Sequence, residues 1–155
     1  MSSDYINIYN NLVNLTRNKD LYKYFDKQDT FSDRLTFLLI HFAFFLKVFK
    51  NTSDKEVLQE IYDFVFRQLE LSIREIGYGD QSINKKMKDY LNLFYGIIDK
   101  IHDWDNMTVE SRCNFLEIFL DNALNTDYLA DYFEKYRLNL LNSTLNLQIK
   151  GVIKH

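Results

Sequence analysis

One stretch of the sequence limits the possible folds more than any other, and it runs from Arg34 to Phe49. Nearly every residue in it is apolar, and His41 interrupts the run near its middle. A helix that is apolar on all sides is a buried helix. The apolar run on either side of His41 is far shorter than the roughly 20 residues that a bilayer crossing needs. We therefore predict a buried central helix at about residues 32–50.

The rest of the chain carries the signals of helices joined by short polar turns. Proline is absent and glycine occurs only four times in 155 residues, so few positions break a helix. A chain of this length is one domain by the usual rule and buries about two-thirds of its unfolded surface. We predict an all-α fold, in which a single domain at residues 1–155 packs about six to seven helices around the central one.

Capping residues place several helix ends. A capping box of Ser53 and Glu56 predicts the start of the helix after the central one, and Gly77 supplies the left-handed conformation that ends it. The residues expected to cap other helices are Asp29 or Thr30, Ser82 and Thr108.

The C-terminal segment at residues 142–155 fits two structures. Leu145, Leu147 and Ile149 alternate with polar residues as in a strand, whereas Leu145 and Ile149 also lie on one face of a helix. We prefer a helix that frays before Gly151. From residue 135 to the end the chain has four basic residues and no acid, so we expect residues 135–155 to contact the ribosome or the inner-membrane surface.

No arrangement of residues indicates catalysis or metal binding. The three histidines lie far apart, at positions 41, 102 and 155, without the spacing of a metal motif. Cys113 falls on an apolar helical stripe, where a thiol behaves as a small hydrophobe. We therefore predict no enzyme activity, no catalytic residue, no metal and no cofactor. The net charge of −3 also argues against specific DNA binding.

The cellular compartment follows from two features of the sequence. A single cysteine cannot form a disulfide within the chain, and residues 1–11 lack the basic leader and apolar core of a signal peptide. We expect a cytoplasmic protein that can rest on the periphery of the inner membrane.

Several segments, in order along the chain, resemble the ubiquinol-cytochrome c chaperone family of mitochondria and alphaproteobacteria. The most specific is Arg-Glu-Ile-Gly-Tyr-Gly-Asp at residues 74–80. The others are Leu12-Val13, Arg17, Leu21-Tyr22, Asp29-Thr30, Arg34-Leu35, Ile40-His41, Phe44-Phe45-Leu46, Lys85-Lys86-Met87-Lys88 and Phe94-Tyr95-Gly96. The resemblance covers roughly residues 10–141 and indicates an alphaproteobacterial-type member.

This resemblance implies a non-enzymatic assembly factor of respiratory complex III, ubiquinol-cytochrome c reductase. Its partner would be newly made cytochrome b or another complex III component, whose maturation and haem acquisition it aids. We expect a monomer or a weak homodimer. The predicted partner-binding residues, where charged and aromatic side chains concentrate, are Arg34, Arg74, Tyr78, Asp80, Lys85, Lys86 and Tyr95. An alternative role for Arg34, Arg74 and Asp80 is an ion-pair lock that holds the glycine turn against the central helix.

His41 leaves two interpretations open. It can be a core histidine that is hydrogen-bonded to a neighbour or to a helix carbonyl. It can also face an aromatic cavity, in which case the protein would be a helical small-molecule binder of haem, quinone or lipid. A haem contact by the chaperone itself would be a form of the second interpretation.

Overall fold

The computed structural model describes residues 5–25, 31–120 and 123–152. These residues form seven α-helices, two 3₁₀ turns and no strand, apart from one isolated bridge between Phe25 and Ala123. The elements are α1 (Ile6–Thr16), η2 (Lys19–Tyr22), α2 (Phe31–Phe49), α3 (Lys55–Ile76), α4 (Asp80–Ile101), η3 (Trp104–Asn106), α5 (Val109–Phe119), α6 (Thr126–Leu141) and α7 (Leu145–Lys150). The predicted all-α fold is confirmed.

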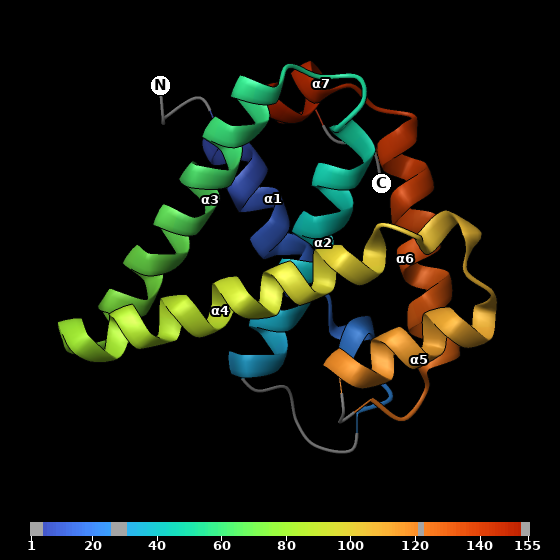
Figure 1. Cartoon of the computed structure of the whole chain (residues 1–155), viewed down its shortest axis with the longest axis horizontal. Helices are drawn as coiled ribbons and strands as arrows, with labels where there is room; N and C mark the ends of the chain where they lie inside the picture. The colour runs from blue at the N-terminus through green and yellow to red at the C-terminus, as the bar shows by residue number, and fades with distance from the viewer. Residues whose placement is uncertain (1–4, 26–30, 121–122, 153–155) are drawn as a thin grey trace.

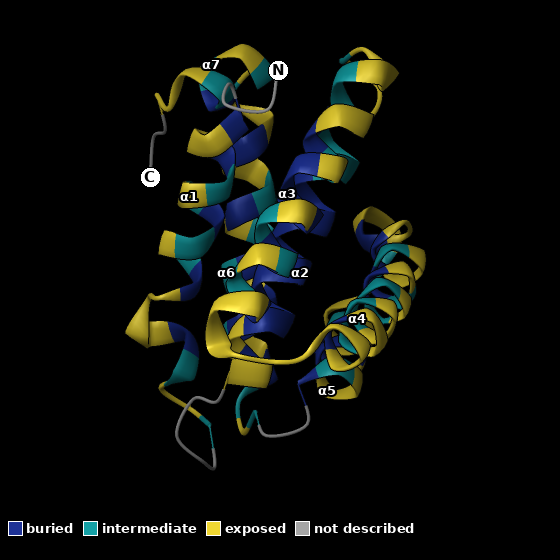
Figure 2. Cartoon of the chain, turned by 90° about the vertical axis from the view of Figure 1, so that its left-hand side faces the viewer, coloured by how far each residue is buried: buried dark blue, intermediate teal, exposed yellow. Residues whose placement is uncertain are grey.

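Helix α2 is the predicted central helix, within one residue of the expected bounds. It packs against α1, α4 and α6, which surround it on different sides (Figures 1 and 2). Its side chains from Leu35 to Phe45 are all buried, so every face of this part of the helix packs against other elements, as its apolar sequence predicts. The expected caps Asp29 and Thr30 lie outside the described residues.

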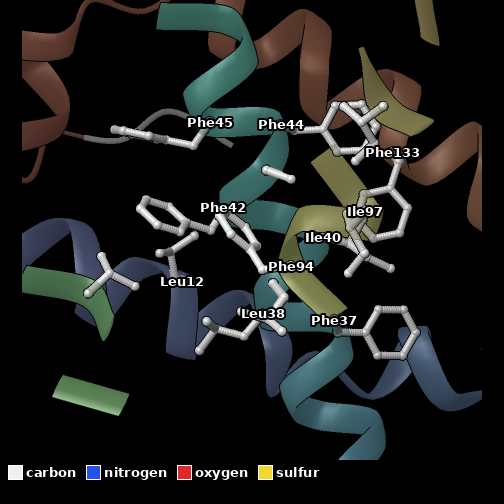
Figure 3. Packing of buried hydrophobic residues seen from close by; sticks show 14 of the residues in the cluster. Leu12, Phe37, Leu38, Ile40, Phe42, Phe44, Phe45, Phe94, Ile97 and Phe133 are labelled. Atoms are coloured by element: carbon white, nitrogen blue, oxygen red, sulfur yellow. The ribbon is translucent and has the colours of Figure 1, made fainter. Parts of the chain in front are cut away.

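Aromatic contacts join α2 to its neighbours. Phe44 and Phe45 point in opposite directions from α2 in Figure 3. The Phe44 ring stacks on Phe133 of α6 at 5.5 Å and meets Trp104 edge-on at 4.9 Å. Such pairs add about 0.5–1.5 kcal/mol each beyond the burial of their surface. One helix therefore connects the N-terminal and C-terminal parts of the chain in a single core.

Helices α3 and α4 meet at a corner that projects from the body, at the lower left of Figure 1. Gly77 ends α3 with φ +104°, as the sequence predicts. The capping box at Ser53 is wrong, because the carboxylate of Asp54 accepts the Glu56 N–H at 2.9 Å instead. Ser82 does not cap α4 either, since that helix already begins at Asp80, after the extended residue Gly79.

The C-terminal part of the chain packs on α2 and α1. Thr108 caps α5 as predicted by accepting the Ser111 N–H at 3.1 Å. After residue 141 the chain forms the short helix α7 and ends it at Gly151, so the helical interpretation is confirmed over the strand. Asn7 of α1 donates to the carbonyl of Ile149 at 3.1 Å and holds α7 in place. No helix among the described residues has both the length and the apolarity to span a bilayer.

Candidate partner-binding surface

The corner between α3 and α4 carries an ion pair. Arg74, in the last turn of α3, donates to the Oδ1 of Asp80, the first residue of α4, at 2.7 Å. The hydrogen bond to Asp80 raises the pKa of Arg74. Because both side chains are well exposed, solvent screens the pair and it adds little to stability. Its geometric effect is to link the two helices across the left-handed Gly77.

Exposed aromatic and basic side chains lie beside this ion pair. The Lys86 ammonium sits 4.5 Å from the centre of the Tyr78 ring, in a cation–π arrangement that holds the ring at the surface. Tyr78 is 41% exposed and Ile76 is 55% exposed, and every residue from 74 to 80 is exposed (Figure 2). We define the corner surface as Arg74, Ile76, Tyr78, Asp80, Lys85 and Lys86.

Two of the predicted partner-binding residues lie elsewhere. Arg34 is in the first turn of α2, which lies well away from the corner in Figure 1, so Arg34 is separated from the Arg74–Asp80 ion pair. Tyr95 is 15 residues beyond Asp80, which is about 22 Å along α4. Its hydroxyl lies 3.2 Å from that of Tyr62 on α3. The structure therefore brings together five of the seven residues: Arg74, Tyr78, Asp80, Lys85 and Lys86.

His41 occupies the interface between α2 and α6. Its Nδ1 lies 2.6 Å from the carbonyl oxygen of Phe37, and its Nε2 lies 2.7 Å from the hydroxyl of Tyr132. Since a carbonyl only accepts, Nδ1 carries the proton, and Nε2 accepts from the tyrosine O–H. Complete burial lowers the pKa of His41 to about 4, so the ring is neutral at pH 7.

The surroundings of His41 are filled by aromatic rings. Tyr132, Phe133 and Tyr136 meet the imidazole edge-on, with centroids 4.9–5.5 Å away. The Tyr136 hydroxyl is buried and has no hydrogen-bond partner in the described part of the chain. The interpretation of His41 as a hydrogen-bonded core histidine is confirmed. Sequence reasoning missed its partner Tyr132, because nothing in the sequence links positions 91 residues apart.

The structure has a pocket that His41 does not line. It has a volume of about 350 Å³ and is lined by the C-terminal end of α2, the first turns of α3 and the C-terminal end of α4. We call it the α2–α3–α4 pocket. It was missed from sequence because its lining comes from three separate segments. The one local signal was the group of lysines at positions 47, 50 and 55 around a polar turn.

Several residues of the basic C-terminal segment, 135–155, form contacts within the fold. Arg137 donates to both carboxylate oxygens of Glu134, at 2.7 and 3.0 Å, and its side chain is only 15% exposed. Leu145 and Ile149 pack against the core, whereas Lys135 and Lys150 are exposed. Contact of residues 135–155 with a membrane or a ribosome therefore stays a prediction, with fewer free groups than the sequence suggested.

Cys113 has the environment of a structural thiol. Its Sγ donates to the Oδ1 of Asp127 at 3.1 Å, and burial raises the pKa of the thiol. A raised pKa lowers the thiolate fraction on which nucleophilic attack depends. Among the described residues no group of histidine, cysteine and carboxylate side chains could hold a metal ion.

Two comparisons with known proteins bear on this geometry. Residues 23–110, more than half of the chain, match the family model described as Ubiquinol-cytochrome C chaperone. The crystal structure of the Cbp3 homolog from Brucella abortus is similar in fold, with a TM-score of 0.75 and 24% identity over 99% of this chain and 88% of that one. Among curated proteins, none matches this chain significantly.

The matched segment contains α2, α3 and α4 together with all seven predicted partner-binding residues. It ends within the first turn of α5, so α6 and α7 lie outside it. The resemblance that the sequence suggested is confirmed, and the chain belongs to the ubiquinol-cytochrome c chaperone family.

Proposed function

We propose that this protein is a non-enzymatic assembly factor of ubiquinol-cytochrome c reductase, respiratory complex III, which binds newly made cytochrome b and aids its maturation. The observation that carries the proposal is that the family match falls on α2–α4, the part of the chain that presents the corner surface. The same surface joins exposed aromatic, apolar and charged groups in one place.

The corner surface has the composition of a protein-binding site. Tyrosine and arginine are enriched at interfaces and supply most of their binding energy, and both are exposed here as Tyr78 and Arg74. Its rim is charged with both signs, from Asp80 to the lysines at 85 and 86.

Charge reversal on the corner surface tests the proposal. The variant Lys85→Glu/Lys86→Glu should capture much less cytochrome b from detergent-solubilised membranes than the native chain does. Its thermal stability should fall only slightly, because it removes the cation–π pair of Lys86 with Tyr78 at the surface and a charge interaction of Lys86 with Tyr90.

The matched control is Lys135→Glu/Lys150→Glu. It makes the same charge change on exposed positions of α6 and α7, outside the family match. We expect this control to capture cytochrome b as the native chain does. Native capture by the Lys85→Glu/Lys86→Glu variant, or an equal loss in the control, would show that the corner surface is not the site.

The alternative function, a small-molecule binder around His41, finds little support in the geometry. A ligand there would have to displace the hydrogen bonds at both ring nitrogens and the rings that surround them. Added haem should therefore give no Soret shift that the variant His41→Ala abolishes. A shift that depends on His41 would favour the alternative.

A further inference from the structure

The α2–α3–α4 pocket has the size and the walls of a ligand site. Its volume of about 350 Å³ is at the lower end of the roughly 300–1,000 Å³ that small-molecule sites occupy. Ala43 and Leu46 of α2, Leu58 of α3 and Ile98 of α4 supply apolar wall. A slender apolar group therefore fits the pocket better than a large ring system or a two-chain lipid.

The charged side chains in the lining of this pocket are lysines. Lys47, Lys50 and Lys55 all line the pocket, and no carboxylate does. The Lys47 ammonium donates to the carbonyl of His102 at 3.1 Å and lies 3.6 Å from Asp105, so part of its charge is balanced. Lys50 and Lys55 are exposed and form no ion pair with any described residue. Among the residues that line the pocket, the lysines are therefore the charged groups that a ligand would meet.

Lys55 lies at the start of α3 between the N-cap residue Asp54 and Glu56 of the first turn. Lys55 is the first residue of α3, where the helix dipole favours an acidic side chain and disfavours a cation. Lys50 follows the last turn of α2, where a cation is favourable. An anion between the two lysines would use both ammonium groups, one after the end of α2 and one at the start of α3.

We propose that the α2–α3–α4 pocket binds one acyl chain of an anionic amphiphile, with this chain against Ala43, Leu46, Leu58 and Ile98 and the acidic headgroup at Lys50 and Lys55. A free fatty acid and the acyl chain of an anionic bilayer lipid share this chemistry. The site is separate from the corner surface, so it stands or falls independently of the proposed function.

Calorimetric titration with dodecanoate below its micelle concentration tests the site. We expect saturable binding of one dodecanoate per native chain. The variant Lys50→Glu/Lys55→Glu should bind dodecanoate with an affinity at least roughly tenfold lower, because two attractive charges become repulsive. Neutral dodecan-1-ol should bind more weakly than dodecanoate and should not distinguish this variant from the native chain.

A second variant fills the pocket instead of changing its charge. Leu58→Trp places a larger side chain at a half-buried position of the wall and should abolish binding. The matched control is Lys85→Glu/Lys86→Glu, with the same charge change on the corner surface, which should bind dodecanoate as the native chain does. If the native chain shows no saturable binding, or if Lys50→Glu/Lys55→Glu binds as tightly as native, the proposal is overturned.

Flotation with phosphatidylglycerol vesicles separates the two sources of the ligand. Flotation that dodecanoate competes away identifies a bilayer lipid as the source. If the chain binds dodecanoate but stays in the soluble fraction, a free fatty acid is the source. Both results support the proposal, whereas flotation that dodecanoate leaves unchanged, together with no dodecanoate binding in solution, contradicts it.

Discussion

Acidification should destabilise the fold through His41 before it affects the carboxylates. The folded pKa of about 4 lies below the ordinary value of 6.5, so in this range the unfolded chain binds the proton more tightly than the folded chain. Neutral His41 therefore costs the fold nothing above pH 6.5, and the free energy of unfolding decreases as the pH falls toward 4, because protons bind the unfolded chain more tightly. For a fully buried group with these values, the loss between pH 7 and pH 4.5 is about 2 kcal/mol.

Urea unfolding, followed by the fluorescence of the single, fully buried Trp104, measures this loss. The native chain should lose about 2 kcal/mol between pH 7 and pH 4.5. The variant His41→Leu should be less stable at pH 7 but nearly independent of pH in this range. The exposed His102 provides the control, since His102→Gln should keep the native slope. A flat profile in the native chain, or a native slope in His41→Leu, would refute the reasoning.

Three further predictions follow from single side chains. Tyr132→Phe leaves the buried Nε2 of His41 without a hydrogen-bond donor and should lower the free energy of unfolding by about 1–3 kcal/mol in urea. Tyr136→Phe removes a buried hydroxyl that has no partner among the described residues, so the same assay should show no change or a gain of up to about 1 kcal/mol. Gly77→Ala should cost about 1 kcal/mol in thermal unfolding because φ is +104°, whereas Gly79→Ala, with φ −72° and open space around it, should stay within about 0.5 kcal/mol. The hydrogen bond from Arg137 is the main cause that lowers the pKa of Glu134 to about 2, so Glu134 stabilises the fold above pH 4.5 and loses this effect as the pH falls toward 2. In Glu134→Gln the free energy of unfolding should therefore depend less on pH between 4.5 and 2, and an unchanged pH dependence would contradict this assignment.

The helical architecture could be predicted from the sequence because its signals are local. The apolar run of α2 and the glycine that ends α3 each specify their structure within a few residues. Capping was less predictable where several polar residues compete. At the start of α3 the side chain of Asp54 takes the role that the pattern gave to Ser53, since both can accept the same backbone N–H groups.

The candidate site was only partly predictable because it depends on how helices are placed in space. The ion pair across Gly77 joins residues six apart and was foreseen. The separation of Arg34 from the corner depends on the direction in which α3 and α4 leave the body, which no local pattern encodes. The same holds for the α2–α3–α4 pocket, whose walls come from three helices.

Site-specific photocrosslinking tests the central claim most directly. A photoreactive amino acid at Tyr78, on the corner surface, should form a crosslink to cytochrome b while that protein is being made. The same probe at Leu138 of α6, which is similarly exposed at 45% but lies outside the family match, should not. A crosslink to cytochrome b from position 138 and none from position 78 would contradict the account.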